Sequence, residues 1–567
     1  MTLHLYDTTL RDGTQREGLS LSVDDKVKIA RALDGLGVSY IEGGWPGSNP
    51  KDAEFFRRLR ETPLGHARLA AFGSTRRAGL RCDDDSNLQA LAAAETPVVT
   101  LVGKSSVLHV ERILETTREE NLRMIGESIA WLKRLGREVI YDAEHFFDGY
   151  RLDSVYALAT LAAAAEAGAD CLVLCDTNGG ELPDAVADRV SEVRARFPVA
   201  VGIHPHNDAG LAVANGLAAV RAGCTQVQGT INGYGERCGN LDLVPLVATL
   251  ELKLGVRTLP PGALRRLTEI SQFVAAVANQ HPDPHAPYVG RSAFAHKGGI
   301  HVAAIAKLAE SYQHADPAAV GNEMRVVVSE VAGRRNVRIR AEALGVTAGE
   351  AEGSVLERIK ELELQGFQFE AAEGSFEMLL RRAAKGYAAP FELDDFTVIV
   401  EKRGGGGSRA QATVRIRVAG EMVLTAADGD GPVNALDRAV RKALLPHYPS
   451  LAEVRLVDYK VRIVDQHLGT GARPRVVIES ARGAERWSTV GCSENIIEAS
   501  WLALCDGLEL PLLRDRAAGL RSEHGNGPAM TGAKAPPENA VSPWPLSSPA
   551  RSRAVEAAPR GDDFGDA

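Results

Sequence analysis

The feature that most limits the fold of this chain is an alternation of strand and helix through its first ~260 residues. Short apolar segments typical of buried strands are each followed by a polar loop and by an amphipathic segment rich in Ala, Leu and Arg. Eight strands are expected, at about 3–7, 38–43, 68–73, 97–102, 138–142, 170–175, 199–203 and 225–230. Eight repeats of this kind favour a (β/α)8 TIM barrel, and an open doubly wound α/β sheet is the alternative.

In such barrels the chemistry lies at the C-terminal ends of the strands, and polar residues gather at these ends in this sequence. In strand order they are Asp7, Arg11 and Asp12; Glu42; Ser74; Lys104; Asp142 and Glu144; Asp176, Thr177 and Asn178; His204, His206, Asn207 and Asp208; and Asn232, Glu236 and Asn240. Single members, such as Asp176, Asn207 and Asp208, also suit a helix N-cap. The set as a whole predicts one site at this end of the barrel.

Two histidines at the end of the seventh strand, in VGIHPHNDAG, predict a metal site there. Side chains two residues apart on a strand point to the same face, so His204 and His206 can bind one ion. Asp12 and the carbonyl oxygen of Asn240 can join them, because the first and eighth strands are neighbours in a closed barrel. This set of nitrogen and oxygen ligands favours Mg²⁺ or Mn²⁺ acting as a Lewis acid, with Zn²⁺ less favoured. Two hydrogen-bonded loop histidines are the alternative interpretation.

The pattern changes after the barrel. Residues ~261–385 have a helical pattern, and from Phe391 apolar strands alternate with two helical segments, GDGPVNALDRAVRKAL and GCSENIIEASWLALCDG. The recurrence of strands then a helix indicates an internal βα repeat in an α+β domain. We expect a barrel over 1–270, helical linker subdomains over 271–388, the C-terminal domain over 389–513 and a disordered, Ala/Pro/Ser/Gly-rich tail over 514–567.

Composition narrows the partners and the compartment. The net charge is −9 and no basic arm is present, so we expect no nucleic-acid partner. No run of about 18 apolar residues and no N-terminal leader pattern occurs, so no membrane association is expected. The seven cysteines are scattered, which fits a reducing, cytoplasmic environment.

Three segments carry a resemblance to a known family. They are LYDTTLRDGTQREG, IHPHNDAGLAVANGLAAVRAG and GTINGYGERCGNLDL, which resemble signature segments of the isopropylmalate, citramalate and homocitrate synthases of the DRE-TIM metallolyase superfamily. Four further segments are most similar to the citramalate synthases within that group: EGGWPGSNPKDAEFF, YDAEHFFDGY, CDTNGG and HADPAAVGNEMRVVVSEVAGRRNV. The resemblance runs from residue 3 to about 510.

The resemblance implies a metal-dependent Claisen-type condensation of acetyl-CoA with a 2-oxo acid, followed by thioester hydrolysis. Arg11 would neutralise the carboxylate of the 2-oxo acid, unless it only pairs with Glu42 or Asp7. Thr177 would donate a hydrogen bond, and Asp142 and Trp45 are further substrate-binding candidates. Glu144 matches the catalytic glutamate of the family; a salt bridge at the rim of the barrel is its alternative role. Lys104 and Arg76 are candidate contacts for the phosphates of CoA.

His301 and Tyr312 match a histidine and a tyrosine that, in this family, reach into the active site of a neighbouring subunit. The resemblance therefore implies catalytic roles for both residues and a homodimer or a higher homo-oligomer. One departure concerns His301: the family often has H-x-D after the preceding glycine, and this chain has GIHVAA.

Pocket size bears on which 2-oxo acid is used. Trp45, Phe72 and Phe146 lie at strand ends where they could shrink the pocket, which predicts pyruvate as the substrate, unless these rings only pack between barrel and helices. The C-terminal domain resembles the family's allosteric domain, with isoleucine as the expected effector and a purely structural dimerisation domain as the alternative. Three functional alternatives remain: a sister synthase for a larger 2-oxo acid, such as a 2-isopropylmalate synthase; a lyase; and a non-catalytic amino-acid sensor.

Overall fold

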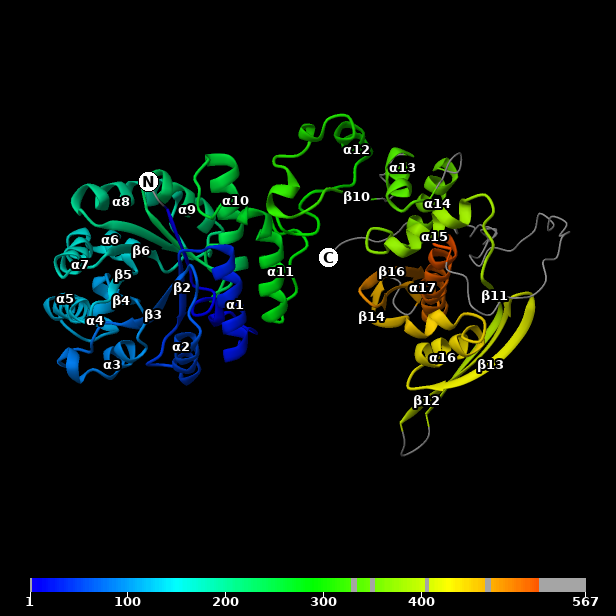
Figure 1. The fold of residues 1–567 in the computed structure, drawn as a ribbon, viewed down its shortest axis with the longest axis horizontal. Coiled ribbons are helices and arrows are strands. Elements are labelled where there is room, and N and C mark those ends of the chain that lie inside the picture. Colours follow the sequence, from blue (N-terminus) through cyan, green and yellow to red (C-terminus); the bar gives the residue numbers. More distant parts are fainter. Residues whose placement is uncertain (1–2, 328–333, 347–351, 403–406, 465–470, 520–567) are drawn as a thin grey trace, which may run out of the picture. The chain divides into compact units, whose positions relative to one another are not determined.

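The structure, a computed structural model, describes residues 3–327, 334–346, 352–402, 407–464 and 471–519 (Figure 1). The chain divides into two compact units. The barrel unit comprises Met1–Ala295 and Leu308–Arg325, and the C-terminal unit comprises His296–Lys307 and the chain from Val326 onward. The chain passes from one unit to the other three times: in the short strand β9 (Ala295–His296), between Lys307 and Leu308, and in the short strand β10 (Arg325–Val326). The predicted linker, 271–388, therefore contributes residues to both units.

Eight parallel strands close into a barrel, which confirms the TIM barrel and excludes the open sheet. The strands are β1 (His4–Asp7), β2 (Tyr40–Gly44), β3 (Arg68–Ser74), β4 (Val98–Lys104), β5 (Glu138–Glu144), β6 (Cys171–Asp176), β7 (Ala200–Pro205) and β8 (Gln226–Gly229). Strand β1 pairs in register with β8, from His4 opposite Gln226 to Asp7 opposite Gly229, and this pairing closes the ring.

The helices that follow the strands form the outer layer in Figure 1. They are α1 (Val23–Leu36), α2 (Pro50–Glu61), α3 (Ser86–Ala93), α4 (Val107–Arg112), α5 (Arg118–Arg134), α6 (Phe146–Leu152), α7 (Ser154–Glu166), α8 (Pro183–Arg196), α9 (Ala212–Arg221), α10 (Leu243–Leu254) and α11 (Leu267–Val277). Local sequence sets their ends. Ser22 and Asp25 form a capping box at the start of α1, and Gly37 ends it at φ 95°, where a Cβ would lie 2.3 Å from Pro260.

The two faces of the barrel strands differ in chemistry. Outward-facing residues such as Leu5, Ile41 and Leu172 pack against the helices in the main core. The inward face is apolar in one cluster, around Tyr6, Tyr40, Val98, Ile140 and Val173. Polar residues are also buried along the barrel strands: Glu42, Thr100, Asp142, Gln226 and Gln228. Because buried polar groups need partners, these residues mark the part of the barrel that is built for chemistry rather than for packing.

The C-terminal unit contains the predicted βα repeat. Its first part comprises α12 (Gly299–Ile305), α13 (Arg334–Ala343), α14 (Glu352–Leu364) and α15 (Glu373–Ala383). Two antiparallel three-stranded sheets follow, each succeeded by a helix: β11 (Phe391–Lys402), β12 (Ser408–Val418), β13 (Glu421–Gly429) and α16 (Pro432–Leu444); then β14 (Arg455–Ile463), β15 (Pro474–Arg482), β16 (Glu485–Cys492) and α17 (Ile496–Ala517). Helix α17 continues past the predicted start of the tail at 514, and residues 520–567 lie outside the described ones.

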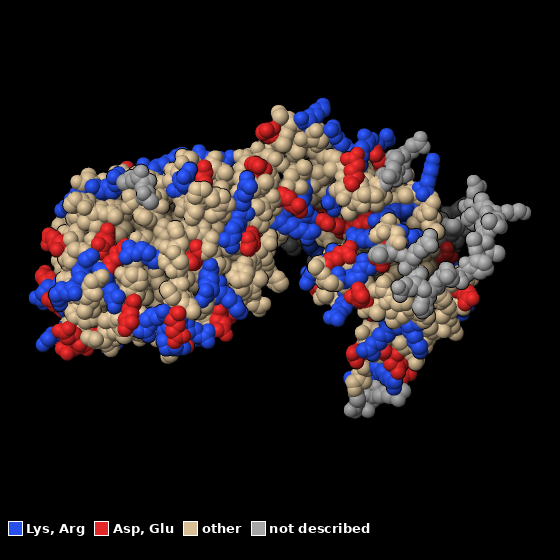
Figure 2. All heavy atoms as spheres, viewed as in Figure 1, with Lys and Arg blue, Asp and Glu red and all other residues tan. Residues whose placement is uncertain are grey.

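The surface bears mixed charge. Figure 2 shows Lys and Arg side chains interspersed with Asp and Glu over the visible face of both units. Within the described residues, no helix is both long and apolar enough to cross a bilayer.

Candidate metal and substrate site

Asp12, His204 and His206 meet at the C-terminal end of the barrel strands. Each offers one ligand atom, and these three atoms all lie within 4.8 Å of one another. Asp12 Oδ2 is 3.1 Å from His204 Nε2 and 4.0 Å from His206 Nε2, and all three residues are buried. The two histidines are two residues apart at the end of β7, so their rings share a side, with centroids 5.3 Å apart. The predicted cluster therefore exists in the fold.

Asn240 supplies the test of whether a cation fits. The side-chain amide of Asn240 donates to the carbonyl of Tyr234 at 3.2 Å, while its Oδ1 is buried without a hydrogen-bond partner. Asn240 also lies opposite His206 in an isolated antiparallel bridge. A buried acceptor without a donor is costly, so an unpartnered amide oxygen on the residue bridged to His206 fits a hard divalent cation.

The charges place Asp12 and His206, but not His204, in their metal-binding forms. Burial lowers the pKa of His204, but the hydrogen bond to Asp12 and the charge of that carboxylate raise it to about 9, so His204 must release a proton when a metal binds. Burial alone would raise the pKa of Asp12, but Arg11 and the two histidines hold the pKa of this carboxyl well below its usual range. Burial and the charge of His204 lower the pKa of His206 to about 4, so His206 is neutral at pH 7. An ionised carboxylate and a neutral imidazole are the forms that bind metal ions.

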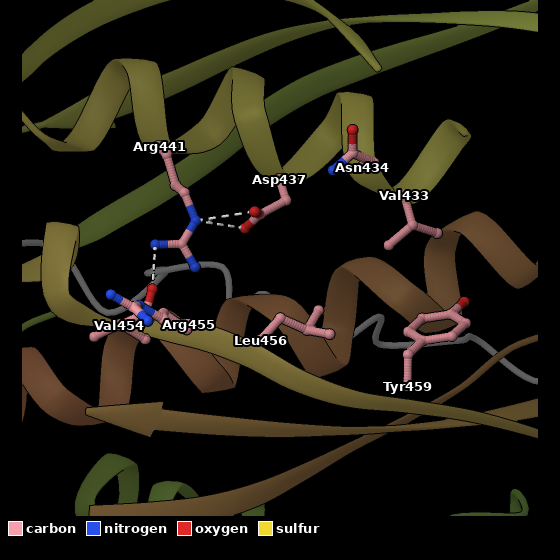
Figure 3. A pocket seen from close by; sticks show the side chains of 8 residues that line it. All are labelled: Val433, Asn434, Asp437, Arg441, Val454, Arg455, Leu456 and Tyr459. Atoms are coloured by element: carbon pink, nitrogen blue, oxygen red, sulfur yellow. Dashed lines mark hydrogen bonds and ion pairs between the residues drawn. The ribbon is translucent and has the colours of Figure 1, made fainter. Parts of the chain in front are cut away.

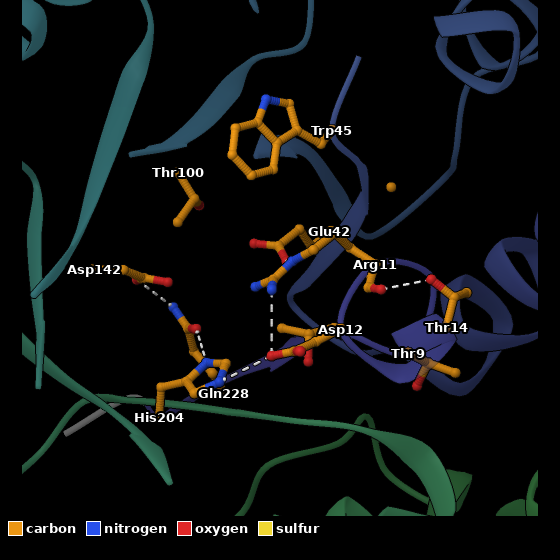
Figure 4. A network of polar contacts seen from close by, with 12 residues as sticks. Thr9, Arg11, Asp12, Thr14, Glu42, Trp45, Thr100, Asp142, His204 and Gln228 are labelled. Carbon is orange, nitrogen blue, oxygen red and sulfur yellow. Dashed lines mark hydrogen bonds and ion pairs between the residues drawn. The ribbon is translucent and has the colours of Figure 1, made fainter. Parts of the chain in front are cut away.

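Arg11 is held from two sides in the same pocket. Its Nε donates to Glu42 Oε1 at 2.5 Å, and its Nη1 lies 3.3 Å from Asp12 Oδ2 (Figure 4). Its guanidinium lies over the ring of Phe72, 3.8 Å from the centroid. The hydroxyl of Tyr6 donates to Glu42 Oε2 at 2.7 Å, which fixes the carboxylate in turn. Arg11 does pair with Glu42, as the alternative interpretation proposed, and it also lines the pocket.

A pocket of about 380 Å³ joins these groups. The predicted substrate residues Trp45, Asp142 and Thr177 line it together with Arg11, Glu144 and three of the four predicted metal ligands, Asp12, His204 and His206. Thr177 Oγ1 accepts from the backbone N–H of His145 at 2.9 Å, so its own hydrogen is available to a ligand. Burial raises the pKa of Asp142 to about 7. The structure thus brings the predicted substrate residues, Glu144 and the Asp12–His204–His206 cluster to one pocket.

Glu144 and Lys104 form an ion pair at the edge of this pocket, with side chains about a quarter exposed. This is the salt bridge considered as the alternative role of Glu144, and both side chains still line the pocket. Arg76 differs from the prediction: its side chain is buried and binds Glu120 and Glu127, each at 2.7 Å, so its charge is already compensated and it is not a phosphate contact.

The three aromatic residues predicted to shrink the pocket lie in two different environments. Trp45 and Phe72 line the pocket and meet edge to face, with ring centroids 5.4 Å apart. Phe146 is fully buried in the main core, where it packs against Phe147 and Tyr150. The prediction that Phe146 shrinks the pocket is therefore wrong. It is the first residue of α6, and it packs into the layer between barrel and helices.

His301 and Tyr312 lie outside the strand ends. His301 is exposed on α12 in the C-terminal unit, and Tyr312, 45% exposed, belongs to the segment of the barrel unit that follows it. Neither is among the residues that line the barrel pocket. Their assignment to the active site of a neighbouring subunit stays a prediction.

The sequence analysis missed Gln228. This residue is fully buried on β8. Its Oε1 accepts from His204 Nδ1 at 2.7 Å, and its Nε2 donates to Asp142 Oδ1 at 3.0 Å. The signal was present: Gln226 and Gln228 alternate on a strand that the fold buries, and buried glutamines need partners.

A second cavity, of about 550 Å³, lies between α16 and β14 in the C-terminal unit (Figure 3). Val433, Leu456 and Tyr459 supply apolar surface. Arg441 donates from Nε to both oxygens of Asp437, at 2.8 and 2.9 Å, and from Nη1 to the carbonyl of Val454 at 3.0 Å. The cavity is therefore apolar at one end and polar at the other.

Comparison with known families covers nearly the whole described chain. Residues 2–274 match the HMGL-like family, residues 288–366 the homocitrate synthase post-HMGL domain-like family, and residues 370–512 the LeuA allosteric (dimerisation) domain. Together with the barrel and its buried Asp–His–His cluster, these modules define a metal-dependent enzyme that condenses acyl-CoA, a transferase with a C-terminal regulatory domain.

Relatives that match most of the chain define its family more narrowly than the three domain families do. The (R)-citramalate synthase of Synechocystis sp. is 51% identical over 526 residues, covering 90% of this chain and 96% of that protein. Those of Streptomyces coelicolor and Aquifex aeolicus are 51% and 49% identical, covering 90% and 91% of this chain and 97% and 99% of those proteins. The chain belongs to the (R)-citramalate synthase family.

Proposed function

We propose that the chain condenses acetyl-CoA with pyruvate and hydrolyses the thioester, giving (R)-citramalate and CoA for isoleucine biosynthesis. The observation that carries this proposal is the guanidinium of Arg11 beside the Asp12–His204–His206 cluster in one small pocket. A 2-oxo acid presents a carboxylate and a keto oxygen on adjacent carbons, so it can meet a fixed cationic fork and a metal at the same time. The relatives of highest similarity reported above carry the same activity in their names.

Each barrel residue has a definite task in this proposal. Asp12, His204, His206 and Asn240 would hold a divalent ion, Mn²⁺ or Mg²⁺ before Zn²⁺, which when bound polarises the keto group of the substrate. Arg11 binds the carboxylate and is kept in place by Glu42. Thr177 donates a hydrogen bond to the substrate, and Asp142 and Trp45 bound the pocket.

Proton removal from the methyl group of acetyl-CoA requires a base held near the thioester. Glu144 is placed at the pocket edge by Lys104 and serves in this acid–base or orienting work. His301 and Tyr312 would complete the site from the partner subunit. Trp45 and Phe72 limit the room beside the keto group, which favours the methyl group of pyruvate over larger side chains.

The test is a free-thiol assay of CoA release with acetyl-CoA and Mn²⁺, comparing pyruvate, 2-oxobutyrate, 2-oxoisovalerate and 2-oxoglutarate. We expect a strong preference for pyruvate. The variant Asp12→Asn should abolish turnover, whereas the control Asp208→Asn, in a nearby loop and paired with Arg237, should retain most of it. Preference for a larger acid would favour a synthase for that acid, such as a 2-isopropylmalate synthase. No CoA release with any of the four acids would favour a non-catalytic amino-acid sensor.

The C-terminal cavity supports isoleucine as the effector. An apolar side chain fits the surface of Val433, Leu456 and Tyr459, and the start of α16 offers backbone N–H groups to a carboxylate. Val433→Trp would fill the cavity, and we expect it to abolish isoleucine binding measured by calorimetry while the basal rate holds. If isoleucine does not change the rate of the wild-type enzyme, the C-terminal domain is better explained as a purely structural dimerisation domain.

We also propose a homodimer with shared active sites in the cytoplasm. All seven cysteines are free, as a reducing compartment requires. Arg11→Ala and His301→Ala are each expected to be inactive alone. Random mixing of the two chains in dimers should restore about a quarter of wild-type activity, because half the dimers then hold one complete site out of two. No recovery on mixing would contradict a site completed by the partner.

A further inference from the structure

A chain of three buried side chains crosses the interior of the barrel behind the metal site (Figure 4). Asp142 on β5, Gln228 on β8 and His204 on β7 are exposed by 3%, 0% and 5%. Gln228 Nε2 lies 3.0 Å from Asp142 Oδ1, and Gln228 Oε1 lies 2.7 Å from His204 Nδ1. Gln228 therefore joins a pocket carboxylate to a residue of the proposed metal site.

The neighbours of Gln228 determine how its amide is oriented. Its Nε2 faces two acceptors: the carboxylate of Asp142 and, at 3.4 Å, Oε1 of Gln226. Where the Asp142 carboxyl is ionised, an amide turned the other way would bring its oxygen against both acceptors with no proton between them. The amide oxygen must therefore face His204.

An amide oxygen accepts hydrogen bonds and cannot donate them. In the metal-bound state, where His204 must be neutral, its ring proton is consequently placed on Nδ1 and the lone pair on Nε2, the atom that faces Asp12. His206 has no such support, because its Nδ1 is buried without a hydrogen-bond partner. The Nδ1 atom of His204 thus has a hydrogen-bond partner, and that of His206 has none.

We infer that Gln228 is a positioning residue of the metal site, which fixes the tautomer and the ring orientation of His204 with Asp142 fixing the amide in turn. The inference rests on the proposed function of the Asp12–His204–His206 cluster as a metal site. Partners that orient a metal-binding histidine typically contribute 10–100-fold to metal affinity.

The experiment measures Mn²⁺ binding to the full-length protein by electron paramagnetic resonance of the free ion, without turnover. The pH is 8.5, above the pKa of Asp142, so that this carboxyl is ionised. We expect Gln228→Leu to raise the Kd for Mn²⁺ by roughly 10–100-fold. The matched control is Gln226→Leu, buried on the same strand. It removes the longer, 3.4 Å contact of Gln228 Nε2 but leaves the bond to Asp142 at 3.0 Å, so its Kd should stay near that of the wild type.

A rescue pair separates positioning from packing. Gln228→Glu keeps an acceptor for His204 Nδ1 but sets a second carboxylate oxygen against Asp142, so it should also bind Mn²⁺ weakly. Adding Asp142→Asn supplies an amide donor to that oxygen and should restore most of the affinity. The same Asp142→Asn added to Gln228→Leu should restore nothing, because no acceptor faces His204.

The outcomes are distinct. A wild-type protein that binds no Mn²⁺, Mg²⁺ or Zn²⁺ overturns the proposed metal site and this inference with it. A wild-type protein that binds Mn²⁺, with Gln228→Leu binding it equally well, overturns the inference alone. Equal weakening by Gln228→Leu and Gln226→Leu, accompanied by equal losses in the melting temperature of the metal-free proteins, shows a packing effect and also overturns it.

Discussion

Glu42 holds the guanidinium of Arg11 in place, so Glu42→Gln tests how this site is built. The side chain of Glu42 is fully buried; one carboxylate oxygen accepts from Arg11 Nε at 2.5 Å and the other from the hydroxyl of Tyr6 at 2.7 Å. Glutamine has nearly the same shape but offers one acceptor oxygen and no charge. The variant therefore removes the charge that balances Arg11 and leaves one of the two hydrogen bonds without an acceptor.

The expected loss follows from burial. Removing one partner of a buried ion pair costs about 3–5 kcal/mol, because the remaining charge is left uncompensated. Arg11 keeps one counter-charge, since Asp12 Oδ2 lies 3.3 Å from its Nη1, so we expect the lower end, about 3 kcal/mol. At roughly 2 °C per kcal/mol, the melting temperature of the barrel falls by roughly 6 °C.

The same change should weaken substrate binding. Without Glu42 the fork of Arg11 turns toward Asp12 and no longer presents both N–H groups to a carboxylate, so the KM for pyruvate should rise about 10-fold or more, the equivalent of about 1.4 kcal/mol. The assays are thermal unfolding of the metal-free protein and steady-state CoA release.

Tyr6→Phe is the matched control for Glu42→Gln. It removes the other hydrogen bond to Glu42 and leaves the ion pair with Arg11 intact. We expect a loss of about 1 kcal/mol in stability and an unchanged KM. A Glu42→Gln enzyme that melts and binds pyruvate like the wild type would refute the argument.

Three further predictions follow from the same geometry. Burial raises the pKa of Asp7 to about 7, so its contribution to stability is present below the unfolded pKa and is lost as the pH rises through 7. In urea unfolding, the free energy of unfolding of Asp7→Asn relative to that of the wild type should therefore increase by up to about 4 kcal/mol between pH 4 and pH 8. A difference that stays constant with pH would contradict this. Phe72→Ala enlarges the pocket, and one methylene group in an apolar pocket is worth about 1–3 kcal/mol. The kcat/KM for pyruvate divided by that for 2-oxobutyrate should therefore fall about 10-fold. An unchanged ratio would show that Phe72 does not select the substrate. Chelation should abolish turnover while far-UV circular dichroism is retained, because the metal cluster lies outside the apolar core, and Mn²⁺ should restore it; full activity in metal-free protein would count against the site.

The barrel and the cluster of His204, His206 and Asp12 could both be predicted from the order of the residues. Both depend on local rules: alternation places β7 residues two apart on one face, and parallel strands bring their C-terminal ends to one edge. The βα repeat of the C-terminal unit was predictable for the same reason, since strand and helix patterns are written in neighbouring residues.

Which polar residues belong to the site and which stabilise the scaffold depends on contacts that form only in the folded chain. Arg76 and Lys104 look alike in the sequence, yet Arg76 is buried between two glutamates and Lys104 reaches the pocket. Phe72 lies near the end of β3 and Phe146 follows β5, but Phe146 packs into the core and Phe72 faces the pocket beneath Arg11. Gln228 gained its role from residues 24 and 86 positions away. Such partners meet only when the barrel closes, because closure sets which inward side chains share one interior.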